Sequence, residues 1–179
     1  MAMMETESIC SATCASKPFK QEPRRIRVCF VCTGTTCRSP MAAAVANFLA
    51  RKQGEEASMV AVSAGLYAVE GDPISPRAVE ALERAGIPWQ SGVDYRAHRA
   101  HTLTEADLEA TDLLVGISAG HCMELLLRFP QAATRITAMP EPIADPYGGD
   151  GDVYSACLAE IIRGVKDLLF SADEKGGAE

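Results

Sequence analysis

The chain has 179 residues, a formal net charge of −7 and 47% hydrophobic residues. This length and composition predict one compact domain whose core is large enough to fold without disulfide bonds. The acidic balance argues against a nucleic-acid partner, which favours a basic face, and no stretch is long and apolar enough to predict a membrane span or a membrane partner.

The seven cysteines are spread along the chain and contain no repeated C-x-x-C pair, which argues against a zinc site or a dense disulfide framework. We therefore expect free thiols, no metal and no cofactor, in a reducing, cytoplasmic compartment. Residues 1–25 lack the apolar segment of a signal peptide, although organellar targeting by this arm is left open. The sequence does not predict an oligomeric state.

The first 25 residues are polar and aperiodic, and they predict a disordered N-terminal arm before a domain at 26–170. A flexible tail is expected at 171–179. Within the domain, short apolar and β-branched runs predict buried strands. These runs are IRVCFV at 26–31, MVAVS at 59–63, LLVGIS at 113–118 and RITAM at 135–139.

Longer segments with helical periodicity alternate with these strands. Ser39 and Ser75 are predicted N-caps, each followed by proline at the first helical position, and Gly86 is a predicted stop. Thr104 and Asp107 predict a capping box. The expected helices are 39–53, 75–86, 104–110 and 152–170.

The alternation of strands and helices predicts an α/β fold of one domain. Its form is a doubly wound, parallel, four-stranded sheet with right-handed crossovers and helices on both faces. In such sheets ligands bind beyond the carboxyl ends of the strands. The segment FVCTGTTCRSPM, at 30–41, lies at that edge, between the first strand and the helix that follows.

Cys32 and Arg38 of this segment indicate a reaction on a bound anion. The backbone N–H groups and the dipole of the helix N-terminus, together with Arg38, would stabilise a thiolate at Cys32 and bind a tetrahedral dianion. Gly34 is expected to let the loop turn and approach the anion closely, and the Ser39 hydroxyl can donate a hydrogen bond to the thiolate. A thiolate beneath a bound phosphoryl group is an in-line nucleophile.

The motif VCTGTTCRSP, at 31–40, resembles the signature of the low-molecular-weight protein-tyrosine-phosphatase family. The segment IADPYGGDGDVY, at 143–154, is similar to the family's general-acid loop, and VSAGL and RAHRAHTLT also look like family segments. The resemblance covers nearly all of 26–170. It implies a phosphate-binding loop formed by Thr33, Gly34, Thr35, Thr36, Cys37 and Ser39 between the nucleophile Cys32 and Arg38.

The resemblance also implies roles for residues outside the loop. Asp145 would protonate the leaving group and later activate water, which is the work of a positioned carboxyl group. Ser63 and His98 would brace the loop by hydrogen bonding, and Tyr147 would flank the substrate. The implied substrates are proteins that carry phosphotyrosine or phosphoarginine, and the implied intermediate is a cysteinyl-phosphate.

Two residues depart from the usual pattern of the family. Thr35 stands where members have an asparagine in the left-handed conformation, which a β-branched residue disfavours, so the sequence predicts a remodelled or less preorganised loop. Thr36 stands where phosphotyrosine-specific members have an aliphatic residue. A phosphoarginine-hydrolysing branch has threonine there, since a hydroxyl suits a guanidinium better than a methyl group does.

Several alternatives remain at this point. A non-catalytic phospho-binding protein would fit the Thr35 departure, and a thiol-coupled arsenate reductase would share the scaffold but needs more cysteines than the single Cys122 in the comparable region. Cys37 is either a redox partner of Cys32 or a small packing residue. His98 is expected to be a structural histidine, and His101 and His121 to lie at the surface. Buried core thiols are expected at Cys29, Cys122 and Cys157.

Overall fold

The structure is a computed structural model that describes residues 24–89 and 94–171. The predicted arm at 1–25 and tail at 171–179 lie almost entirely outside these residues and stay predictions. The four strands are β1 Ile26–Cys32, β2 Met59–Gly65, β3 Leu113–Gly116 and β4 Ile136–Ala138. The α-helices are α1 Arg38–Gln53, α2 Pro76–Arg84, α3 Glu105–Glu109, α4 Ala119–Arg128 and α5 Gly151–Leu169, and two 3-10 helices span Tyr95–Ala97 (η1) and Pro130–Arg135 (η2).

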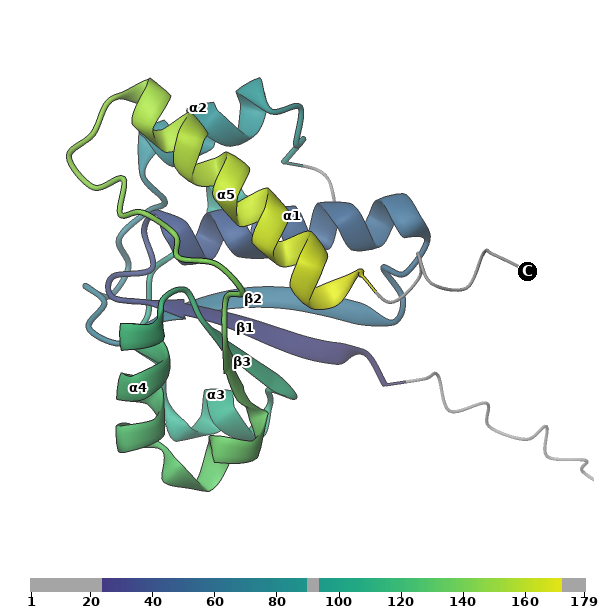
Figure 1. Cartoon of the computed structure of the whole chain (residues 1–179), viewed down its shortest axis with the longest axis vertical. Helices are drawn as coiled ribbons and strands as arrows, with labels where there is room; N and C mark the ends of the chain where they lie inside the picture. Colours follow the sequence, from purple (N-terminus) through teal and green to yellow (C-terminus); the bar gives the residue numbers. More distant parts are fainter. Residues whose placement is uncertain (1–23, 90–93, 172–179) are drawn as a thin grey trace, which may run out of the picture.

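The four strands form one parallel sheet in the order β2-β1-β3-β4. Helices α1, α2 and α5 cover one face of the sheet, and α3 and α4 cover the other (Figure 1). The predicted doubly wound fold is therefore confirmed. None of the helices in the described ranges is long and apolar enough to cross a bilayer.

After the central strand β1, the chain first forms β2 on one side of β1 and later forms β3 on its other side. The winding thus reverses beside the carboxyl end of β1, which is where open α/β sheets bind their ligands. Phe30 and Val31 are fully buried on opposite faces, one in each half of the core. This burial fixes the strand from which the FVCTGTTCRSPM segment starts.

Most of the predicted helix signals are confirmed. Ser75 and Pro76 begin α2, Gly86 follows its end with a φ of 70°, and Thr104 and Asp107 form a reciprocal capping box at the start of α3. The prediction that Ser39 is an N-cap is wrong. Helix α1 begins one residue earlier, at Arg38, and no side chain caps it, because the Ser39 hydroxyl is used by the preceding loop.

Helix α4 was not predicted from the sequence, and it packs closely on the sheet. Ser118 caps it by accepting a hydrogen bond from the His121 backbone N–H, at 3.3 Å. The end of β3 touches the first turn of α4 so tightly that a Cβ at Gly116 would lie 2.6 Å from the Cys122 nitrogen. This contact places the first turn of α4 beside the carboxyl edge of the sheet.

Candidate active site

The loop between β1 and α1 folds around the Cys32 sulfur. Cys32 is 3% exposed, and its Sγ lies 3.0 Å from Ser39 Oγ and 3.3 Å from the Thr35 backbone nitrogen, which donates to it. A thiolate can only accept hydrogen bonds, so the Thr35 N–H can stabilise the ionised sulfur as it stands. The single Ser39 hydroxyl hydrogen is donated to Thr35 Oγ1 here, and it can reach the sulfur only by turning from Thr35 to Cys32. The predicted contact between Ser39 and Cys32 is present.

Thr35 is the residue that shapes the loop. It is fully buried, and its φ of 48° is the only positive value among the non-glycine residues that the structure describes. Its Oγ1 lies 3.0 Å from Ser39 Oγ, and its carbonyl accepts a hydrogen bond of 2.6 Å from His98 Nε2. The loop thus keeps the left-handed geometry despite the β-branch, at a cost of roughly 1–2 kcal/mol.

One half of the prediction for Gly34 is wrong, the special turn, while its close approach to a bound anion stays a prediction. The left-handed residue of the loop is Thr35, and Gly34 does not have a positive φ. A Cβ at Gly34 would meet nothing closer than the Thr36 hydroxyl, at 4.0 Å. What Gly34 provides is therefore an open backbone toward the cavity rather than a special turn.

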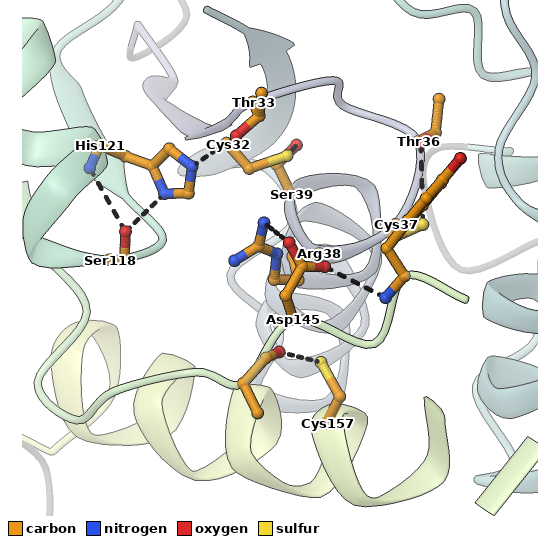
Figure 2. Close-up of polar contacts among 12 residues, drawn as sticks. Cys32, Thr33, Thr36, Cys37, Arg38, Ser39, Ser118, His121, Asp145 and Cys157 are labelled. Carbon is orange, nitrogen blue, oxygen red and sulfur yellow. Dashed lines mark hydrogen bonds and ion pairs between the residues drawn. The ribbon is translucent and has the colours of Figure 1, made fainter. Parts of the chain in front are cut away.

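Arg38 and Asp145 meet across the mouth of the loop. Arg38 Nη2 lies 2.6 Å from Asp145 Oδ2, with the arginine side chain 11% exposed and the carboxylate 54% exposed (Figure 2). Asp145 Oδ1 accepts the Tyr147 N–H at 3.2 Å, and the Tyr147 side chain is largely exposed. A cavity of about 300 Å³ is lined by residues 32–38, Asp145 and Tyr147.

A histidine that the sequence analysis placed at the surface belongs to this site. His121 is buried, with 9% exposure, because α4 packs directly on the end of β3. Its Nε2 lies 3.0 Å from Thr33 Oγ1 and its Nδ1 lies 2.8 Å from Ser118 Oγ (Figure 2). The sequence signal was available, since Ser118 and His121 follow the third strand at the edge where ligands bind.

The two histidines that touch the loop are both held neutral. Burial lowers the pKa of His98, against the hydrogen bond to Thr35, which raises it. Burial and the nearby Arg38 charge lower the pKa of His121, against the Asp145 charge. A neutral ring has one N–H. Because a carbonyl can only accept, His98 carries its hydrogen on Nε2.

Of the remaining predicted site residues, some lie at the cavity and others do not. Cys37 is buried and its Sγ lies 3.2 Å from the Tyr154 hydroxyl, while Thr36 is half-buried at the cavity. Ser63 is buried on β2, but within the described ranges its hydroxyl makes no hydrogen bond to the loop.

Cys29 and Cys157 are core thiols, and burial raises the pKa of each to about 12. Cys122 is half-exposed on α4 rather than in the core.

Comparison with known proteins agrees with this geometry. The family model for low molecular weight phosphotyrosine protein phosphatase matches residues 27–177. The chain belongs to this phosphatase family. Membership makes it a hydrolase, and the matched range includes the whole of the sheet, the loop and Asp145.

Relatives in the phosphatase family carry two kinds of name. The chain is 35% identical over 144 residues to a protein-arginine-phosphatase of Geobacillus stearothermophilus, covering 75% of this chain and 88% of that one. It is 34% identical over 139 residues to a probable low molecular weight protein-tyrosine-phosphatase of Ralstonia solanacearum, covering 75% and 88%. The crystal structure of a low molecular weight protein tyrosine phosphatase from T. tengcongensis matches with a TM-score of 0.72 and 36% identity, over 80% of this chain and 97% of that one.

Proposed function

We propose that this phosphatase dephosphorylates proteins through a cysteinyl-phosphate on Cys32, with phosphoarginine as its preferred substrate. The observation that carries the mechanism is the gathering of Cys32, Arg38 and Asp145 around one cavity of about 300 Å³. This volume suits a phosphorylated side chain. Phosphorylated proteins are therefore the proposed partners, and the cytoplasm is the proposed location.

In the first step the Cys32 thiolate attacks phosphorus. The bond between phosphorus and the leaving atom breaks, and Asp145 transfers its proton to that atom. The phosphoryl oxygens are held by Arg38 and by the N-terminus of α1, whose first N–H groups are not capped by any side chain. The loop thus offers its donors before the substrate arrives, which reduces the reorganisation needed in the transition state.

In the second step water attacks the cysteinyl-phosphate. The Asp145 carboxylate takes a proton from the water, the S–P bond breaks, and the sulfur leaves as a thiolate. Ser39 Oγ, 3.0 Å from the sulfur, can donate to the thiolate as it forms. Inorganic phosphate departs, and Asp145, which now carries the proton taken from the water, is ready to protonate the next leaving group.

Support for phosphoarginine comes from Thr36 and from the named relatives. Thr36 lines the cavity with a hydroxyl that lies 3.7 Å from Cys37 Sγ (Figure 2), and a relative with 35% identity is named an arginine phosphatase. Phosphotyrosine is the second candidate. The exposed Tyr147 ring at the mouth of the cavity could flank an aromatic leaving group, and a structural neighbour with 36% identity is named a tyrosine phosphatase.

The substrate preference is tested at Thr36. Replacing Thr36 with isoleucine is expected to lower the ratio of kcat/KM for a phosphoarginine peptide to that for a phosphotyrosine peptide by about tenfold, because an apolar group removes a polar contact to the guanidinium. Thr36→Ser, which keeps the hydroxyl, is the matched control and should retain the ratio. An unchanged ratio in Thr36→Ile would show that Thr36 does not set the preference.

Thr35 motivates the competing hypothesis of a phospho-binding protein without activity. Replacing Thr35 with asparagine, which tolerates positive φ, is expected to raise the free energy of unfolding by about 1 kcal/mol and to raise kcat. Thr35→Val, which keeps the β-branch and loses the contact to Ser39, should lower both. Urea unfolding and aryl phosphate turnover measure the two effects. Phosphate binding without turnover in the unaltered chain would favour the non-catalytic hypothesis.

The other two alternatives stay less supported. An arsenate reductase would need a relay of cysteines, and the described cysteines outside the loop are Cys29, Cys122 and Cys157. Two of these are core thiols with a pKa of about 12, so they are poor relay groups. A redox role for Cys37 remains a prediction, because its contact with Tyr154 also fits a residue that simply packs.

A further inference from the structure

Ser63 is a buried residue on the outer edge of β2 whose outward backbone N–H and C=O groups have no hydrogen-bond partner in the described ranges. β2 is an edge strand, and its residues alternate between those whose backbone groups face β1 and those whose groups face outward. Leu66, just past β2, donates to the Cys32 carbonyl, so the even-numbered positions face β1. Ala61, Ser63 and Gly65 therefore present their N–H and C=O groups outward.

Two of these three residues have partners. The Asn47 side chain pairs with Ala61: its Oδ1 accepts the Ala61 N–H at 2.9 Å and its Nδ2 donates to the Ala61 carbonyl at 2.8 Å. Gly65 donates to the His101 carbonyl at 3.0 Å and accepts from the Leu103 N–H at 2.8 Å. The Asn47 side chain thus makes the two hydrogen bonds that one residue of a neighbouring strand would make. We call the outward N–H and C=O of one β2 residue a rung.

Ser63, between them, has no such partner. Pairing from Gly65 does not continue to Ser63, because Arg99 pairs with Pro73 instead. Neither the backbone groups nor the hydroxyl of Ser63 make a hydrogen bond outside the sheet within residues 24–89 and 94–171, although the residue is only 7% exposed. Buried backbone groups are rarely left unpaired, so this rung is suited to an incoming partner.

A cavity of about 410 Å³ opens at this rung. It is larger than the cavity at the phosphate loop, and its volume is in the range of small-molecule sites. Pro40, Ala43 and Ala44 of α1 form an apolar wall, and Tyr95 and Ala97 of η1 also line the cavity. His98 lines it as well, and its Nδ1 makes no hydrogen bond to the described residues.

We propose that this cavity is a second ligand site, for a small planar molecule with a cis-amide edge, such as a lactam or a nucleobase-like ring. The rung needs an acceptor for the Ser63 N–H and a donor for the Ser63 carbonyl, placed side by side. This is the pattern with which the Asn47 carboxamide meets Ala61, two residues away on the same edge. The flat ring of such a ligand would pack on the alanine-rich wall of α1.

A peptide strand fits this edge less well. Asn47 occupies the rung before Ser63, and residues 101–103 occupy the rung after it, so only one rung is open. β-strand addition relies on several successive rungs. The cavity adjoins the phosphate loop through His98. This residue lines the cavity, and its Nε2 donates to the Thr35 carbonyl.

The test uses 2-quinolinone, a bicyclic lactam, titrated into the ¹⁵N-labelled full chain and followed by NMR. We expect saturable shifts centred on the Ser63 amide, with smaller changes at Thr33 to Thr36. N-methyl-2-quinolinone, which lacks the N–H donor, should bind about tenfold more weakly. Since binding rather than turnover is measured, the result is independent of whether the proposed phosphatase activity is correct.

A matched pair of variants places the ligand. Ala97 and Ala106 are both exposed, but only Ala97 lines the cavity. Ala97→Phe should fill the cavity and weaken binding of 2-quinolinone by at least about tenfold, whereas Ala106→Phe should leave it unchanged. Equal affinity for the lactam and its N-methyl form, shifts confined to the phosphate loop, or no saturable binding up to the solubility limit of the probe would each overturn the proposal.

Discussion

Replacing Cys32 with serine is expected to lower kcat for p-nitrophenyl phosphate by at least about a thousandfold. A serine hydroxyl is not ionised at neutral pH and is a far weaker nucleophile than a thiolate. It is also a poorer leaving group, so any phosphoryl group that reached the serine oxygen would remain there. Cys32 Sγ accepts a hydrogen bond from the Thr35 N–H and lies 3.0 Å from Ser39 Oγ, and both contacts would be available to a thiolate.

The matched control for this variant is Cys157→Ser. Cys157 is a buried thiol on α5 that donates to the Ala144 carbonyl at 3.4 Å, and burial raises its pKa to about 12. A serine hydroxyl can make the same hydrogen bond, so kcat should stay within about twofold. If Cys32→Ser retained turnover within about tenfold of the unaltered chain, Cys32 would not be the nucleophile. Phosphate binding by Cys32→Ala would show that the loop is still folded.

The second large effect is expected at Asp145. Asp145→Asn keeps the shape of the side chain but removes the proton donor, and kcat for phenyl phosphate should fall by about 10²–10⁴-fold. The loss should be much smaller for 2,4-dinitrophenyl phosphate, whose leaving group departs without protonation. This dependence on the leaving group distinguishes general-acid catalysis from a structural role, which would reduce both rates alike.

The ion pair with Arg38 gives the Asp145 variant a second signature. In the ligand-free site the Asp145 carboxylate lies 2.6 Å from the Arg38 guanidinium, so a phosphoryl group competes with it. Neutral asparagine competes less, and phosphate should bind Asp145→Asn at least as tightly as it binds the unaltered chain. Asp150→Asn is the control: Asp150 caps α5 in the same loop, asparagine caps helices equally well, and kcat should change by less than about twofold.

Much of this architecture can be predicted from the sequence because local and long-range signals agree. Residues 28–32 of β1 are buried on both faces of the sheet, and Pro40 marks the first turn of the helix that follows the loop. Cys32, Arg38 and Asp145, the proposed catalytic residues, therefore come from segments whose places in the fold are fixed by chain order. At Thr35 the β-branch predicted a remodelled or less preorganised loop, whereas the residue keeps a left-handed φ of 48° and its N–H donates to Cys32 Sγ.

The parts that could not be predicted depend on contacts between distant segments. Ser39 has the sequence of an N-cap, but its hydroxyl bonds to Cys32 and Thr35, so the helix starts earlier. His121 contacts Thr33 across 88 positions of sequence; its place after the third strand pointed to the site, but no local pattern specifies its contact with Thr33. Ser63 was expected to brace the loop, whereas it faces a separate cavity on the outer edge of β2.

The absence of a side chain at Gly116 has a consequence for the loop between β1 and α1. Because the first turn of α4 touches the strand backbone directly, the imidazole of His121 is brought within reach of Thr33. Any larger residue at this position would act as a wedge, moving the helix outward and detaching the ring from the threonine. The hydrogen atom that Gly116 carries in place of a methyl group thus sets the distance between α4 and the phosphate loop.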